Sequence, residues 1–173
     1  MAEIMNKPDV LMKLQQELEA IVGKDNIVEE YHIQQLPYLY AVMKEVLRIH
    51  PVVPLLVPHC PSDTCTVGGY TIPKGSHVSV NFHPERFLDN KLDFRGKDFN
   101  YFPFGSGGII SVGIAMAERM YMYSVASLVH SFNWRLHEGE TLDLTEKLEI
   151  VLKKKMPLVA IPTPRLSKQT PYE

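Results

Sequence analysis

The sequence of 173 residues predicts an α+β fold that is mainly α, formed by a single domain over residues 1–173. Three stretches repeat apolar residues at spacings of three and four, which is the pattern of an amphipathic helix. Short runs rich in β-branched and aromatic residues lie beside proline and glycine turns, which is typical of a small β-sheet. The sequence has no internal repeat and no linker long enough to separate two domains.

The first predicted helix begins near Pro8, because a proline in the first turn of a helix loses no hydrogen bond. Asn6 precedes it and is a suitable capping residue. The apolar stripe of this helix runs from Val10 to Val22, and Gly23 then supplies a left-handed end. We expect the striped face to lie against an apolar surface.

Two further helices are predicted, over Leu36–Ile49 and Val112–Ser131, from the same apolar spacing. The second helix ends at His50 because a residue that precedes proline is disfavoured in the helical conformation. The following stretch, Pro51–Pro61, contains four prolines and must be extended.

Four strands are predicted, over Thr66–Ile72, His77–Asn81, Ile150–Leu152 and Leu158–Ile161. The first two are joined by Pro73-Lys74-Gly75, which is a turn signal. The lysines at 153–155 interrupt the last two, and we interpret them as a solvated strand end rather than an anion site.

Composition excludes several classes of protein. The 18 basic and 20 acidic side chains give a formal charge of −2, which argues against a nucleic-acid binder. Two cysteines, Cys60 and Cys65, do not make a disulfide scaffold. No run approaches 18 apolar residues, so the sequence predicts no transmembrane segment, and the polar start does not resemble a secretory signal. We therefore expect a soluble, intracellular chain.

Taken alone, the polar motifs indicate little. Glu45 and Arg48 lie three residues apart on one helix face, which by itself predicts an exposed ion pair worth less than about 1 kcal/mol. The Arg86 side chain in Pro84-Glu85-Arg86-Phe87 could bind a carboxylate with two hydrogen bonds, but such a motif is more often surface decoration.

The glycine-rich loop Phe102–Gly113 precedes the third helix and directs backbone N–H groups toward whatever lies before it. It fits neither a dinucleotide fingerprint nor a phosphate-binding loop nor a nucleophile elbow, so on its own it is more often structural. A zinc site at His59, Cys60 and Cys65 is less favoured than two reduced thiols.

In order and together, these motifs resemble the C-terminal third of a cytochrome P-450, a haem-thiolate monooxygenase. The motifs are Glu45-Val46-Leu47-Arg48, Pro84-Glu85-Arg86-Phe87 and the loop at 102–113, which opens a helix. Gly68-Gly69-Tyr70-Thr71-Ile72-Pro73-Lys74-Gly75 supports them. The resemblance covers nearly the whole chain and is nearest in character to the plant geraniol and flavonoid hydroxylases.

The resemblance implies a haem cofactor and insertion of one oxygen atom from O₂ into a small apolar plant metabolite. It also implies an NADPH-dependent reductase as electron donor and anchorage to the endoplasmic reticulum in full-length relatives. In the loop it implies that Phe104 packs under the haem and that Gly107 and Gly113 belong to the haem-binding motif. A cysteine near the end of that loop supplies the axial thiolate in the family.

Outside the loop, the resemblance implies a buried structural triad formed by Glu45, Arg48 and Arg86. It also places the extended segment that contains His59 near a haem propionate. His59 is therefore a candidate residue for residual haem binding.

The sequence departs from the family motif at two positions of the haem-binding loop. Ile109 stands at the arginine position, and Ser111 stands at the cysteine position of the axial ligand. A hydroxyl is far less acidic than a thiol and is a poorer donor to iron. Cys60 and Cys65 belong to another segment and cannot replace it. We therefore expect no thiolate-supported catalysis, assign no catalytic residue and no metal ligand, and leave haem binding in doubt.

Two segments of the family pattern are absent from the sequence. It begins after the oxygen-activating helix of the family, so the distal half and the membrane anchor are missing, and this predicts a cytoplasmic chain. The helical segment that family members carry between the strand and the Pro-Glu-Arg-Phe motif is missing between Asn81 and Phe82.

Three hypotheses follow: an inactive truncated relative, a haem-binding protein without monooxygenase activity, or a non-catalytic interaction module. The third rests on the apolar stripes of the first and third helices, which would lack their family partners and favour self-association. We also expect the chain to fold poorly alone.

Overall fold

The computed structural model describes residues 1–52, 65–67, 70–72, 84–88, 93–95, 101, 103–105, 110–149 and 151–166. The helical elements are α1 (Ala2–Asn6), α2 (Pro8–Ile21), η1 (Glu30–Gln35), α3 (Pro37–Ile49), η2 (Pro84–Phe87) and α4 (Ile114–Ser131). The strands are β1 (Cys65–Val67), β2 (Tyr70–Ile72), β3 (Phe132–Arg135), β4 (Glu146–Leu148), β5 (Leu152–Lys154) and β6 (Ile161–Pro164). The fold is α+β and mainly α, as predicted.

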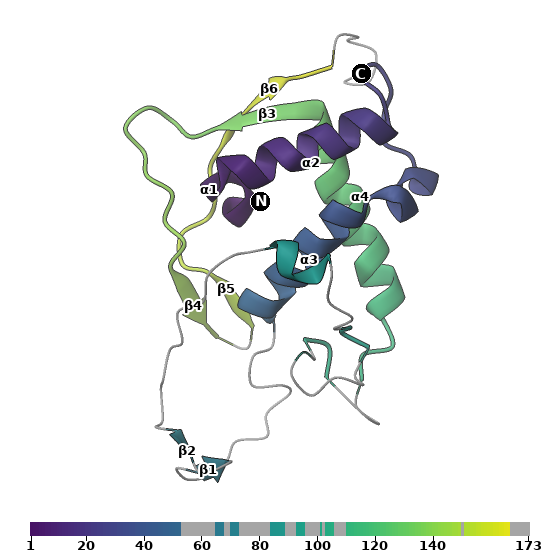
Figure 1. Ribbon diagram of the computed structural model, residues 1–173. Helices are drawn as coiled ribbons and strands as arrows, with labels where there is room; N and C mark the ends of the chain where they lie inside the picture. The colour runs from purple at the N-terminus through teal and green to yellow at the C-terminus, as the bar shows by residue number, and fades with distance from the viewer. Residues whose placement is uncertain are drawn as a thin grey trace.

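The core lies where α2, α3 and α4 pack together (Figure 1). The apolar stripe of α2 is fully used here, because Val10, Leu14 and Leu18 are all buried. From α3 the core receives Leu39, Val42 and Met43, and from α4 it receives apolar residues of its second half. The first helix therefore does not expose an apolar face, contrary to the expectation behind the interaction-module hypothesis.

The described strands form three separate antiparallel pairs: β1 with β2, β3 with β6, and β4 with β5. The β3–β6 pair runs beside α2 in Figure 1, and the Gln15 side chain of α2 donates to the Asn133 side chain of β3 over 3.2 Å. The β4–β5 hairpin lies near the C-terminal end of α3 (Figure 1). These two pairs thus flank the helical core.

The predicted helix boundaries are confirmed with one correction. The helix α3 matches its prediction, α4 begins at Ile114, and Gly23 adopts the expected left-handed conformation with φ of 87°. Asn6 does not cap α2, because it is the last residue of the separate short helix α1. Lys7 leaves the helical region, with φ −126° and ψ 86°, since the proline that follows disfavours that region.

Three strand predictions are wrong. The strand expected over Leu158–Ile161 overlaps the observed β6 (Ile161–Pro164) only at Ile161. The stretch expected to form one strand over Thr66–Ile72 is a pair of strands, and the two residues between them are Gly68 and Gly69, a pair typical of two-residue hairpin loops. Lys153 and Lys154 do not interrupt a strand but belong to β5. The strand predicted at His77–Asn81 lies outside the described residues. Within the described part of the chain, no helix has the length and apolar character of a membrane span.

Candidate functional site

Glu45 and Arg48 form a buried ion pair on α3, not an exposed one. Arg48 Nε donates to Glu45 Oε2 over 2.7 Å and Nη2 donates to Oε1 over 2.9 Å, so the guanidinium binds both carboxylate oxygens. The Glu45 side chain is 0% exposed and that of Arg48 is 21% exposed. The hydrogen bond that Arg48 donates to Glu45 raises the pKa of Arg48, against the effect of burial. A buried charge is stable only beside its counterion, so this ion pair fixes the positions of both side chains.

The Pro-Glu-Arg-Phe motif forms η2, which packs closely on α3. Pro84 and Phe87 are buried, so the motif is part of the core rather than surface decoration. Arg86 lies in η2, but its side chain is outside the described part of the structure. The structure therefore brings the Arg86 backbone to the helix that carries Glu45 and Arg48, and the predicted triad contact remains a prediction.

Glu85 connects η2 to two helices. Its Oε1 accepts from Tyr38 Oη of α3 over 2.9 Å and from Lys13 Nζ of α2 over 2.5 Å. Burial favours the neutral acid, but the hydrogen bonds from Lys13, the backbone of Glu85 itself and Tyr38 outweigh it and hold the pKa of Glu85 at about 2. The carboxylate is consequently charged throughout the neutral range.

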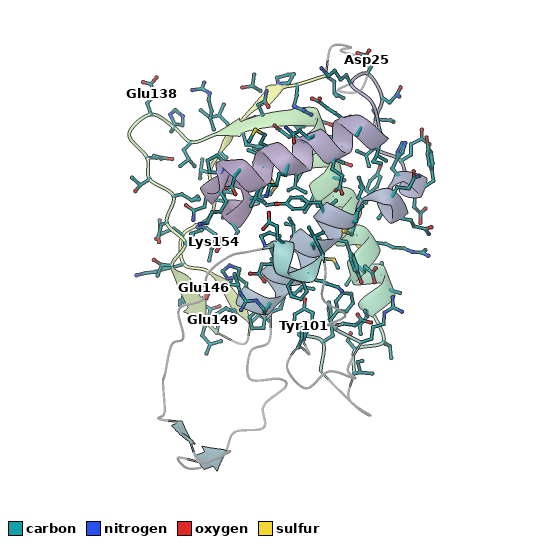
Figure 2. The ribbon with its side chains drawn as sticks, viewed as in Figure 1. Asp25, Tyr101, Glu138, Glu146, Glu149 and Lys154 are labelled. Carbon is teal, nitrogen blue, oxygen red and sulfur yellow. The ribbon has the colours of Figure 1, made fainter. Side chains whose placement is uncertain are left out.

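An aromatic cluster supports the start of the glycine-rich loop. Tyr101 lies 5.3 Å from Phe87 and 6.4 Å from Phe94 between ring centroids, and Phe94 lies 5.6 Å from Phe104. Tyr101 Oη also donates to the Lys44 carbonyl oxygen of α3 over 2.5 Å (Tyr101 is labelled in Figure 2). These contacts attach the loop to α3 and leave Phe104 partly buried at the margin of the core.

The loop then turns back on itself before α4. Gly105 is buried with φ of 80°, a conformation that favours glycine. Ser111 N–H donates to the Phe104 carbonyl oxygen over 3.0 Å, which closes the loop. Gly113 is the residue before α4, and a Cβ there would meet Ser111 Oγ at 3.7 Å, an ordinary contact, so the backbone at this point does not itself require glycine.

Ser111 is exposed, and its Oγ accepts a hydrogen bond from the Gly113 N–H over 3.3 Å. This is a local turn contact of the kind that serine makes at the start of a helix. Of the predicted haem residues, the structure brings together Phe104, Ser111 and Gly113 at this end of α4. Gly107, Ile109 and His59 lie outside the described residues.

The described residues contain no group of three or more histidine, cysteine or acidic side chains able to hold a metal ion. His59, Cys60 and His77 lie outside the described part, and Cys65 falls on β1. The weak zinc hypothesis is therefore left without support from the described residues.

Sequence reasoning missed the residue that caps α3. Glu17 of α2 accepts the Tyr38 N–H at 2.7 Å and the Leu39 N–H at 3.0 Å, which are free donors at the start of α3. One signal was present: Leu36 and Pro37 open this helix without a serine, threonine or acidic capping residue, so an acceptor had to come from elsewhere.

Comparisons with known proteins place the chain in a family. The cytochrome P450 family model matches residues 1–161. Geraniol 8-hydroxylase of Catharanthus roseus is 42% identical over 182 residues, which cover 94% of this chain and 37% of that protein. Flavonoid 3'-monooxygenase of Petunia hybrida is 39% identical over 191 residues, which cover 97% of this chain and 37% of that protein.

The solved structure of a zebra fish cytochrome P450 with abiraterone has a TM-score of 0.72 and 29% sequence identity, covering 95% of this chain and 41% of that one. The chain thus spans little more than a third of the length of the curated relatives it matches. The ordered motifs, the α3–η2 packing and the loop before α4 agree with these matches. The chain belongs to the cytochrome P450 family.

Proposed function

We propose that this chain is a cytochrome P450 family protein without thiolate-supported monooxygenase activity, because Ser111 stands where the family motif has its axial cysteine. The activity lost would be the O₂- and reductase-dependent hydroxylation of small apolar metabolites, the activity class of relatives such as geraniol 8-hydroxylase. The observation that carries the proposal is the side chain at 111 and its surroundings in the loop.

The donor at position 111 does not fit a thiolate-bound haem. A thiol has an ordinary pKa near 8.5, so a metal ion and a helix N-terminus can bring it to the thiolate form. A neutral hydroxyl is a harder and weaker donor to iron. Ser111 Oγ also accepts the Gly113 N–H, so it is engaged in its own turn. No catalytic step through haem is therefore derived for this chain.

Two further departures support the proposal. Ile109 replaces the arginine that the family motif directs at a haem propionate, so a charged contact to the cofactor is lost. The match to the Petunia hybrida enzyme extends over 191 residues but covers only 97% of the 173 residues of this chain, so that relative carries residues with no counterpart here. This supports the expectation of a missing segment between Asn81 and Phe82.

The test is spectroscopic. The purified chain is incubated with haem, reduced anaerobically and exposed to carbon monoxide. We expect no Soret band characteristic of a thiolate-ligated carbonyl complex, and no oxidation of geraniol when an NADPH-dependent reductase is added. Either signal from the unmodified chain would overturn the proposal.

Cysteine variants test whether the side chain at position 111 causes the loss of thiolate ligation. Ser111→Cys, alone and with Ile109→Arg, restores the family ligand set, whereas Ser124→Cys adds a cysteine at an exposed position of α4 away from the loop. A thiolate band in the Ser111→Cys chains but not in Ser124→Cys would assign the loss of ligation to position 111. Haem absorption that saturates without a thiolate band in the unmodified chain would instead support residual haem binding.

A second candidate function is a binding module that acts through α4. Four large apolar side chains, Val112, Met116, Met120 and Tyr123, are exposed at or beside one face of this helix. Faces of this kind mark interaction sites in soluble proteins. We propose self-association through this face, and sedimentation of the unmodified chain against Met116→Glu/Met120→Glu tests it. A strictly monomeric unmodified chain would exclude it.

A further inference from the structure

We propose that His50 is a protonation-dependent clasp that holds α1 and the β4–β5 hairpin against the C-terminal end of α3. His50 is the residue that ends α3. Its Nε2 lies 2.9 Å from Glu3 Oε1 of α1, and its Nδ1 is hydrogen-bonded to Glu146 Oε1 of β4. Three elements that are distant in the sequence thus meet at one imidazole ring. Figure 2 shows Glu146 on the hairpin beside this end of α3.

The positions of the Glu3 and Glu146 carboxylates favour the protonated form of the His50 ring. A neutral imidazole carries one N–H donor and one acceptor nitrogen, whereas an imidazolium carries two donors. Both ring nitrogens of His50 face a carboxylate oxygen, which accepts and cannot donate when ionised. Both contacts are hydrogen bonds only when His50 is protonated. Loss of the proton leaves one nitrogen lone pair facing a carboxylate, so one of the two contacts is lost.

The other charged groups near His50 do not replace its hydrogen bonds to Glu3 and Glu146. A small cavity of about 210 Å³ beside His50 is lined by Met1 and Glu3, by Glu146 of β4, and by Lys153 and Lys154 of β5. Lys153 Nζ is held by Glu149 at 2.6 Å, and Lys154 Nζ donates to the Asp143 carbonyl oxygen. On α3, Arg48 is bound to Glu45.

The proton therefore strengthens a contact between separate parts of the fold. The hydrogen bonds that His50 donates to Glu3 and Glu146 raise its pKa, against the opposing effect of burial. Below pH 6.5, the ordinary pKa of histidine, His50 stabilises the attachment of α1 and the hairpin to α3 in full. This stabilisation is lost as the pH rises through the raised pKa of His50. One main-chain hydrogen bond, from the Leu152 N–H to the Val52 carbonyl oxygen at 2.9 Å, does not titrate. The hairpin is thus loosened at higher pH but stays attached.

The test is amide hydrogen exchange of residues 146–154 in the full chain at pH 6 and pH 8.5, corrected for intrinsic exchange rates, with an NMR titration of the His50 ring. We expect protection to fall about two- to tenfold at the higher pH, the range given by one or two partly exposed ion pairs. In Glu146→Gln the pH dependence should shrink and the pKa of His50 should fall.

The matched control is Glu140→Gln, which removes one negative charge from an exposed position before β4 that does not line the His50 cavity. It should keep the pH dependence of the unmodified chain. His50→Gln should make the protection independent of pH. If that variant does not fold, Glu3→Gln and Glu146→Gln decide, because each must lower the His50 pKa. A His50 pKa at or below 6.5, pH-independent protection in the unmodified chain, or an equal effect of Glu140→Gln would overturn the proposal.

Discussion

Arg48→Ala should destabilise the chain severely, because it removes the guanidinium that binds both oxygens of a fully buried carboxylate. Glu45 is 0% exposed and accepts two guanidinium hydrogen bonds, at 2.7 and 2.9 Å. Removing one partner of a buried ion pair costs about 3–5 kcal/mol, since the remaining charge keeps its desolvation penalty without its counterion. The Arg48 side chain is 21% exposed, so water can reach part of the vacated space. We therefore expect the low end of that range, about 3 kcal/mol.

The assay is urea unfolding followed by circular dichroism, with the free energy of unfolding taken from the midpoint and slope. Arg119→Ala is the matched control, because Arg119 is paired with Glu30 at 3.6 Å and both side chains are more than 70% exposed. Its loss should cost less than about 1 kcal/mol. Equal effects of the two alanine variants would refute the assignment of Glu45–Arg48 as a buried structural pair.

Three further outcomes are expected. Glu17→Ala should lower the free energy of unfolding by about 1–2 kcal/mol in urea titrations, because two N–H donors at the start of α3 lose their acceptor. Leu18→Ala should cost about 2–5 kcal/mol, since Leu18 is fully buried, whereas Met12→Ala on the exposed side of the same helix should cost little in the same assay. Burial lowers the pKa of His130, so its contribution to stability is present above pH 6.5 and is lost as the pH falls further, and thermal unfolding of His130→Gln should show a weaker acid dependence than that of the unmodified chain.

Local signals predicted the helices well. The spacing of Leu39, Met43 and Val46, with proline at both ends, was enough to define α3. The break between α1 and α2 was missed, although Pro8 contained the information: the same ring that suits the first helical turn also prevents the preceding residue from continuing a helix. A single residue thus ended one helix and began the next.

Strand pairing was harder to predict, because it depends on residues far apart in the sequence. Phe132 pairs with Pro164 in the β3–β6 ladder, and neither neighbourhood carries a signal that specifies the other. The β1–β2 pair was missed for another reason, since Gly68 and Gly69 were assigned to a strand although they are a hairpin signal.

Contacts of the candidate site were likewise predictable only where the residues are close in the sequence. The spacing of Glu45 and Arg48 predicted their contact, but only the packing of η2 and Tyr101 against α3 accounts for its burial. The sequence indicated that α3 needs an acceptor at its start, but it did not identify Glu17 or the His50 contacts, because these join residues 21 to 96 positions apart.

The structure separates what the fold requires from what the family's chemistry requires. Folding depends on the buried ion pair of α3, on η2 and on the aromatic ring that joins the loop to them, and the structure shows all of these contacts. The axial donor contributes nothing to that packing, because Ser111 is exposed and its hydroxyl contacts only its own turn. Replacing a thiol by a hydroxyl at such a position should therefore leave stability nearly unchanged. It follows that Ser111→Cys should alter ligand chemistry without altering the free energy of unfolding, whereas Arg48→Ala should lower the free energy of unfolding.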